Sequence, residues 1–180
     1  CIRDSIHSMR LAAIDIGSNA MRLLINDVIE LNGKPHFVKL GLFRVPVRLG
    51  WDVFNDGKIS DQNIQRLISA LSAYKNFTDA YQVDFLRACA TSAMRDANNS
   101  KQIIATIQQS TGIDLEVIHG KVEAELIRQA EWQGNLSKQV DYLYMDVGGG
   151  STEYSLYRGN EVIKSKSFNI GTIRLLADKV

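Results

Sequence analysis

The sequence predicts an α/β protein with a mixed sheet, helices packed on that sheet, and a duplicated architecture. Two observations indicate this class. Short apolar runs alternate with amphipathic helical patterns along most of the chain. In addition, one order of elements occurs twice, starting at Leu11 and again at Tyr142. In both places a strand is followed by an Asp-Ile/Val-Gly loop, a second strand, a turn and a third strand. Because hairpins precede the strand–helix alternation, strands are expected to run in both directions.

The first copy is expected to open with three strands, at residues 11–16, 21–29 and 37–47. The first strand stops at an Asp-Ile-Gly-Ser-Asn loop, and Asn32-Gly33 is a strong hairpin signal before the third strand. Residues 50–57 are expected to form a mobile loop. Ser60 follows them as a helix N-cap.

The remaining elements of the first copy are expected to be a helix after Ser60, a strand at 85–90, a helix that Gly112 closes, a strand at 115–118 and a helix at 121–133. The first of these helices is indicated by residues at helical spacing, namely Ile64, Leu67, Ile68, Leu71, Tyr74 and Thr78. The second is indicated in the same way by Ile103, Ile104 and Ile107.

The second copy is expected to have strands at 142–145, 154–157 and 162–168, with a turn at Gly159-Asn160. About fifty residues follow Gln133, which is too few for a sheet covered on both faces. We therefore expect a complete first lobe at residues 9–128 and an incomplete second lobe at 129–180, in a chain that is a fragment or continues past Val180. Residues 1–8 are expected to be a leader or a cloning remnant.

The amino-acid composition limits the classes of partner that the protein is expected to bind. The 180 residues are 45% hydrophobic and 23% charged, which is ordinary for a folded domain. A net charge of +1 offers no basic field for nucleic acid, so a polyanion must be held by local donors and bound metal. No stretch approaches the roughly 20 apolar residues of a membrane-spanning helix, so no membrane partner is expected. Cys89 lies in an apolar run and is expected to be a buried structural thiol, in keeping with a reducing, cytoplasmic location.

The first loop, Asp15 to Asn19, has the residue types of a phosphate site. Glycine allows a tight turn, and the backbone N–H groups of Gly17, Ser18 and Asn19, with the serine hydroxyl, can point at phosphate oxygens. Asp15 beside them can hold a hydrated divalent cation. An ordinary hairpin turn is the alternative for this loop taken alone.

The second loop, Asp146 to Thr152, strengthens the first. Three consecutive glycines carry a large entropic cost on ordering, which a purely structural turn rarely needs. Its expected phosphate ligands are Gly148, Gly149, Gly150 and Ser151. Asp146 and Glu153 are expected to join Asp15 at a metal, although Glu153 could instead be a solvated residue on the strand face. Two such loops predict a clamp that grips phosphate from both sides of a cleft.

With these motifs the chain resembles the Ppx/GppA family of exopolyphosphatases and guanosine pentaphosphate phosphohydrolases, within the actin, sugar kinase and heat-shock chaperone ATPase superfamily. The resemblance covers residues 9–180 and is carried by segments 15–19, 91–97, 120–124, 146–153 and 171–175. It implies an actin-like ATPase (ribonuclease H-like) fold with helices on both faces of the sheet. It also implies Mg²⁺- or Mn²⁺-dependent hydrolysis of a terminal phosphoanhydride in polyphosphate or guanosine pentaphosphate (pppGpp). The sequence permits a homodimer.

The resemblance implies a catalytic glutamate within residues 120–124. The family usually has two adjacent glutamates there; the second aligns with Glu123, and the first aligns with Val122. A helix start alone would keep the pKa of Glu123 low, and a first-turn acid that complements the helix dipole is the alternative. Arg95 is expected in a loop, where its forked guanidinium group is suited to bind a non-terminal phosphate. The alternative is that Arg95 forms a surface ion pair with Asp96.

Two other functions remain open from the sequence. One is an ATP-using kinase or ATPase of the same fold. The other is a non-catalytic phosphate or nucleotide sensor, in which Val122 marks lost chemistry. If the two loops form a clamp, the two lobes are expected to move relative to one another as substrate arrives, about a hinge near the helix at 121–133.

Overall fold

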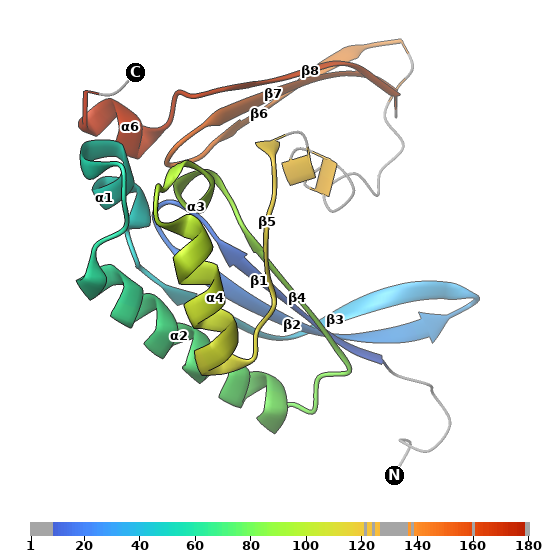
Figure 1. The fold of residues 1–180 in the computed structure, drawn as a ribbon. Helices are drawn as coiled ribbons and strands as arrows, with labels where there is room; N and C mark the ends of the chain where they lie inside the picture. Colours follow the sequence, from blue (N-terminus) through green and yellow to red (C-terminus); the bar gives the residue numbers. More distant parts are fainter. Residues whose placement is uncertain are drawn as a thin grey trace.

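The computed structural model describes residues 9–120, 122–123, 125–126, 137, 139–159 and 161–178. They form a five-stranded sheet and a separate three-stranded sheet (Figure 1). The expected lobe boundary, between residues 128 and 129, lies outside the described residues. Below, the first lobe means the elements up to β5, and the second lobe means β6 to α6. None of the described helices is long and apolar enough to span a membrane.

The first sheet is mixed, as the sequence predicts. Its strands are β1 (Met9–Ile16), β2 (Met21–Leu31), β3 (Lys34–Val45), β4 (Phe85–Ala90) and β5 (Leu115–Val117), in the order β3-β2-β1-β4-β5. β1, β2 and β3 form an antiparallel meander, whereas β4 and β5 run parallel to β1. Asn32 and Gly33 both have positive φ, 55° and 72°, as the predicted hairpin turn requires.

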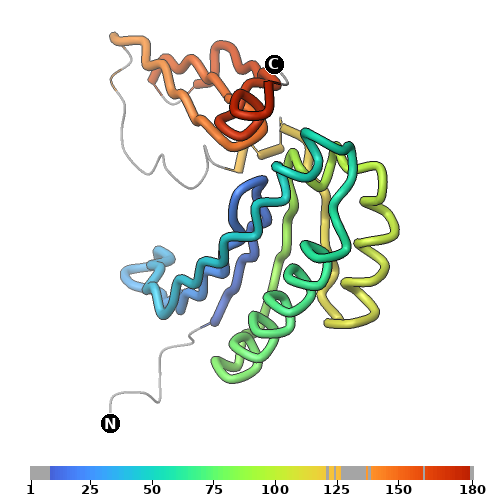
Figure 2. The backbone as a smooth tube through the Cα atoms, turned by 90° about the vertical axis from the view of Figure 1, so that its left-hand side faces the viewer, coloured from blue at the N-terminus to red at the C-terminus, as the bar shows by residue number. Residues whose placement is uncertain are grey.

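One face of this sheet is covered by α2 (Asp61–Ala80) and α4 (Ser100–Thr111), which pack side by side (Figure 2). The predicted N-cap is confirmed, because Ser60 Oγ accepts a hydrogen bond from Asn63 N at 3.3 Å. Gly112 ends α4 in the left-handed conformation, with φ of 69°. The core between sheet and helices includes Ile14, Ile16, Met21, Leu23, Ile25, Leu67, Leu71, Tyr74, Ile103 and Ile107.

Two expected loops are short helices instead. Residues 50–57 were expected to be a mobile loop, but α1 (Leu49–Asp56) buries Leu49, Val53 and Phe54. The carboxylate of Asp52 accepts hydrogen bonds from the backbone and hydroxyl of Ser60, which ties α1 to the start of α2. The segment that carries Arg95 is α3 (Ser92–Asp96), which buries Ala93 and Met94. Both helices form because tertiary contacts cover their apolar side chains.

The second sheet repeats the opening of the first. Its strands β6 (Asp141–Val147), β7 (Thr152–Arg158) and β8 (Glu161–Phe168) form an antiparallel meander in the order β6-β7-β8. A short helix, α6 (Thr172–Leu176), follows, as α1 follows β3. The predicted duplication is therefore present in these elements, and α1 contacts α6.

The other face of the first sheet borders a cavity. Ala13 and Cys89 alternate away from the core toward this face, and Leu126 lines the same cavity. Residues 120, 122–123 and 125–126 are helical, so helical residues lie beyond both faces of the sheet. Residues 127–133 of the expected helix lie outside the described part of the chain.

Candidate functional site

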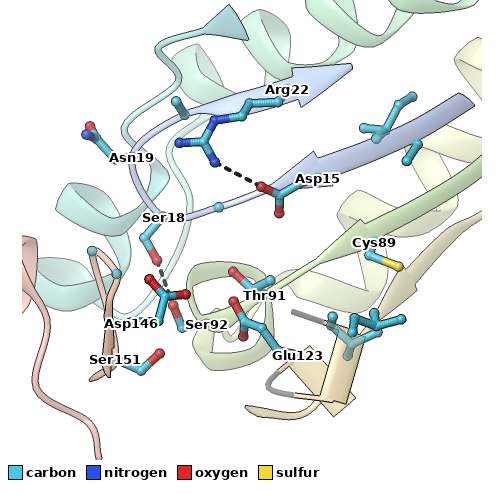
Figure 3. Close-up of a pocket in the computed structure, with 18 of the residues that line it drawn as sticks. Asp15, Ser18, Asn19, Arg22, Cys89, Thr91, Ser92, Glu123, Asp146 and Ser151 are labelled. Carbon is cyan, nitrogen blue, oxygen red and sulfur yellow. Dashed lines mark hydrogen bonds and ion pairs between the residues drawn. The ribbon is translucent and has the colours of Figure 1, made fainter. Parts of the chain in front are cut away.

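A cavity of about 730 Å³ lies where β1 and β6 end, between the two lobes (Figure 3). Most of the predicted site residues line it: Asp15, Gly17, Ser18, Asn19, Glu123, Asp146, Gly148, Gly149 and Ser151. The first loop, the second loop and the helical stretch that carries Glu123 therefore meet at one place. Gly150, Glu153 and Arg95 do not line this cavity.

The two loops adopt the same turn. Gly17 N donates a hydrogen bond to Ala20 O at 3.0 Å, and Gly148 N donates to Ser151 O at 2.9 Å. A Cβ on either glycine would lie 3.2 Å from the carbonyl oxygen that its own N–H contacts. This shared geometry places a close backbone turn at equivalent points of the two lobes, as the repeated sequence pattern predicts.

The glycines of the second loop allow it to pack against the first lobe. A Cβ on Gly149 would lie 3.1 Å from Ser18 Cβ. A Cβ on Gly150 would lie 2.4 Å from Ser92 Oγ and 2.6 Å from the ring of Phe54. Gly150 is buried, so its lack of a side chain serves this contact between the lobes.

Two hydroxyl residues belong to the cavity although the sequence analysis did not select them. Thr91 and Ser92 line it at the end of β4, and Ser92 Oγ lies 2.7 Å from Ser18 Oγ (Figure 3). The signal was present, because both lie in the 91–97 segment that supported the family resemblance. Within that segment Arg95 was the predicted phosphate ligand, because a guanidinium matches the geometry of phosphate oxygens.

Arg95 makes contacts within the first lobe. Its Nη1 donates to Ile118 O at 3.1 Å, and its Nε lies 3.7 Å from Asp96 Oδ1. The ion pair with Asp96 is the alternative that the sequence left open, and it is present. The expected role in phosphate binding stays a prediction.

Glu123 has the most distinctive electrostatics in the site. Its pKa is raised to about 7, mainly by burial and next by the nearby charge of Glu153, while Arg95 opposes the shift. Its Oε2 is buried and accepts no hydrogen bond within the described residues. The expectation of a low pKa at a helix start is wrong, because burial outweighs the helix dipole here.

Three other carboxylates lie near this glutamate. Asp15 has a raised pKa, mainly through burial, although Arg22 at 3.3 Å favours its charged form and Asp146 disfavours it. Glu153 is only 4% exposed, and its Oε1 accepts a hydrogen bond from Ser167 Oγ at 2.7 Å. The alternative of a solvated strand-face glutamate is therefore wrong.

These carboxylates suit a hydrated cation better than a bare one. Within the described residues, no three acidic, histidine or cysteine side chains are grouped closely enough to hold a metal directly. Asp15 and Asp146 nevertheless face one cavity, and the charge of each disfavours ionisation of Glu123. Oxygen ligands of this kind fit Mg²⁺, which keeps several waters and binds through one or two carboxylates and substrate phosphates.

The part of the cavity over the first sheet is basic. Arg22, Arg44 and Arg87 line it, and Arg22 and Arg44 are direct cross-strand partners. Arg22 pairs with Asp15 and Arg87 pairs with Glu116, whereas Arg44 forms no ion pair in the described part of the chain. Two like charges placed opposite each other on a sheet disfavour the fold, which favours an anion between them.

Cys89 differs from its prediction. It was expected to be a buried structural thiol, but it is half-buried and lines the cavity beside Asp15, its partner in the β1–β4 register. Burial is the main cause that raises its pKa, which keeps the thiol protonated and weakly reactive. Strand alternation explains the difference, because Ala88 and Ala90 point into the core and Cys89 points to the other face.

The repeated meander, with a glycine turn after the first strand of each copy at one shared cavity, defines a protein of the actin-like ATPase fold. The chain belongs to the Ppx/GppA phosphatase family, whose model matches residues 29–180. Among its relatives, exopolyphosphatase 1 of Mycobacterium tuberculosis is 31% identical over 169 residues, which cover 93% of this chain and 48% of the relative. Exopolyphosphatase 2 of the same organism is 37% identical over 173 residues, covering 92% and 53%.

A solved structure agrees with this assignment. The crystal structure of an exopolyphosphatase from Cytophaga hutchinsonii superposes with a TM-score of 0.80 at 33% identity, over 94% of this chain and 53% of that one. The chain thus spans about half the length of the relatives that it matches.

Proposed function

We propose that the protein hydrolyses a terminal phosphoanhydride bond of inorganic polyphosphate, or of pppGpp, and releases orthophosphate. The observation that carries this proposal is Glu123, a carboxylate with a pKa of about 7 and an unbonded buried oxygen at a cavity shared by two glycine turns. Relatives named exopolyphosphatases support the polyphosphate substrate. The family name supports phosphatase chemistry.

The reaction needs a water molecule aimed at the terminal phosphorus. Glu123 Oε2 is free to accept a hydrogen bond from that water and then its proton. The water oxygen forms a bond to phosphorus, the bridging P–O bond breaks, and the shortened phosphate chain leaves with the bonding electrons. A base with a pKa near neutrality accepts this proton more readily than an ordinary glutamate does.

The two loops hold the terminal phosphate for this attack. The N–H groups of Gly17 and Gly148 bond within their own turns, so the other backbone N–H groups of both turns, with the hydroxyls of Ser18 and Ser151, are the donors that can contact its oxygens. Asp15 and Asp146 would hold Mg²⁺ or Mn²⁺ with intervening waters. When bound, that cation neutralises charge on the phosphate oxygens.

The three arginines that line the cavity suggest how a polyanionic substrate is oriented in it. Both loops, Glu123 and Asp146 line the cavity, and Arg22, Arg44 and Arg87 line it from strands of the first sheet, where Arg22 pairs with Asp15. The terminal phosphate would sit between the loops with the cation, and the rest of the polyanion would extend over the arginines. A guanidinium binds phosphate oxygens in this way without a metal.

The test measures orthophosphate release by the full-length protein from long-chain polyphosphate, pppGpp and ATP. Glu123→Gln should lower kcat by about 10²–10⁴-fold and leave phosphate binding largely intact. Glu125→Gln is the matched control, because Glu125 is an exposed helical neighbour. Near-normal kcat in Glu123→Gln would remove Glu123 from the mechanism. Release from ATP alone would favour the ATPase alternative, and binding without release would favour the sensor.

A further inference from the structure

The segment Gly171 to Leu175 supported the family resemblance without a role in the site, and its contacts with the second loop suggest one. Backbone N–H groups and two side chains of this segment donate hydrogen bonds to successive carbonyls of the glycine run. These bonds are Thr172 N to Gly148 O (3.0 Å), Thr172 Oγ1 to Gly148 O (3.4 Å), Ile173 N to Gly149 O (2.9 Å), Arg174 N to Gly149 O (3.2 Å) and Arg174 Nε to Gly150 O (2.9 Å).

These contacts determine where the loop's own donors point. In a trans peptide the N–H and the C=O point in opposite directions. Because the carbonyls of residues 148–150 point toward the 171–174 segment, the N–H groups of residues 149–151 point away from it. Gly149 and Ser151 line the cavity. The segment therefore holds the loop as a preformed set of anion donors.

Arg174 extends this contact to the first lobe. Its Nη2 lies 2.5 Å from Asp96 Oδ2 on α3, and its guanidinium lies 4.0 Å from the ring centroid of Phe54 on α1. Its side chain is 13% exposed. One guanidinium thus contacts a loop carbonyl of the second lobe and two helices of the first.

We propose that Arg174 is a positioning residue that couples the conformation of the phosphate loop to the contact between the lobes. When the lobes are together, Asp96 and Phe54 hold the guanidinium where its Nε can bind Gly150 O. When the lobes separate, those two contacts are lost and the loop carbonyl is held less firmly. Phosphate affinity then falls as the cleft opens, which favours product release. The proposal rests on the proposed function only in taking the ligand to be phosphate.

The test compares arginine variants of the full-length protein for binding of orthophosphate, measured by calorimetry, and for hydrolysis of tripolyphosphate. Arg174→Met should weaken orthophosphate binding by about 10- to 100-fold, since it removes two charge-assisted hydrogen bonds. It should also raise KM more than it lowers kcat. Arg174→Lys should recover only part of the loss, because one ammonium cannot bond Asp96 and Gly150 O in the same fork geometry.

Arg158→Met is the matched control. Arg158 makes a two-bond pair with Asp141, at 2.7 and 2.8 Å, within the second lobe and at the strand ends remote from the loop. It should leave orthophosphate affinity unchanged. Asp96→Asn, at a partly exposed carboxylate, keeps the test valid if Arg174→Met is poorly folded. It should weaken binding in the same direction but less, and its effect should not add to that of Arg174→Met.

Wild-type affinity for orthophosphate in Arg174→Met, or an equal loss in Arg158→Met, would overturn the proposal. So would full additivity of Asp96→Asn and Arg174→Met. Binding without hydrolysis by the wild type would contradict the proposed function and still leave the role of Arg174 measurable. A wild type that hydrolyses tripolyphosphate but binds no orthophosphate would overturn the role of Arg174 in phosphate affinity and leave the proposed function standing.

Discussion

Ser18 Oγ and Ser92 Oγ lie 2.7 Å apart, so that one hydrogen bond between buried hydroxyls joins the first loop to α3. A hydroxyl has a single proton. The donor of this bond therefore has none left for a ligand, and only the acceptor can donate to a phosphate oxygen. The pair acts as one donor at the cavity, held in place by two elements.

Removing one member should cost stability because the other hydroxyl loses its partner. Ser92→Ala should lower the free energy of unfolding by about 1 kcal/mol, and Ser18→Ala by a similar amount. The double variant should cost less than the sum, since no unpaired hydroxyl is then left. Urea denaturation of the three variants measures this, and strictly additive losses would show that the bond contributes nothing.

Activity should depend on pH through Glu123. A general base must be deprotonated, so kcat/KM should rise with pH and level off above about 7, the pKa of this carboxyl. Glu123→Gln should lose that rise, and Glu125→Gln should keep it. Excess Mg²⁺ should move the rise to lower pH, because a nearby cation favours the carboxylate. A flat profile between pH 5 and 8 in the wild type would contradict the assignment.

The free energy of unfolding should also depend on pH through Glu123, but it should fall as the pH rises, whereas activity should rise. The folded pKa of about 7 exceeds the ordinary value of 4.5, so the folded state binds more protons between these values. The stabilisation from Glu123 is complete below about pH 4.5 and is lost as the pH rises through 7. Glu123→Gln should therefore be more stable than the wild type at pH 8, by roughly 1–2 kcal/mol, and show no such gain at pH 5. Thermal unfolding of the wild type and of Glu123→Gln at pH 5 and pH 8 measures this difference in stability.

Removal of divalent metal should stop hydrolysis. A chelator in excess should abolish orthophosphate release, and added Mg²⁺ or Mn²⁺ should restore it. Asp146→Asn should raise the Mg²⁺ concentration needed for half-maximal activity by about tenfold. Asp141→Asn, at the other end of β6, is the control and should leave that Mg²⁺ concentration unchanged. Full activity in excess chelator would rule the metal out.

The two glycine turns should behave as one unit. Gly17→Val and Gly149→Val should each raise KM, because a branched side chain prevents close approach of the backbone. Their effects should fall short of additive, since a Cβ at Gly149 would already press on Ser18 of the other loop. Normal kinetics in Gly17→Val beside a total loss in Gly149→Val would reduce the first loop to a structural turn.

Most of the fold could be predicted from local patterns. Strand alternation, the Asn32-Gly33 turn, the Ser60 cap and Gly112 are properties of neighbouring residues, and the structure agrees with each. The helices α1 and α3 could not be predicted in this way. Their apolar residues are buried by contacts with distant parts of the chain, such as Phe54 against Arg174 and Gly150.

The candidate site could likewise be predicted only where its residues are neighbours in the sequence. Both loops were predicted because glycine, acid and hydroxyl residues lie together in sequence. The arginines over the first sheet were missed, since Arg22 and Arg44 become neighbours only through the strand register. The pKa of Glu123 was misjudged because burial of the carboxyl and the charge of Glu153 depend on the tertiary structure.

The contact of Gly150 with Ser92 and Phe54 has a consequence for polymeric substrates. It packs the second loop against α1 and α3 of the first lobe, which would leave a bound polyphosphate chain no path between the lobes at this point. A polyphosphate chain could then enter only with its tip foremost, and an internal stretch of chain would have nowhere to continue. Degradation would proceed from a free end, one phosphate per turnover, and a ring of phosphates with no end would escape it.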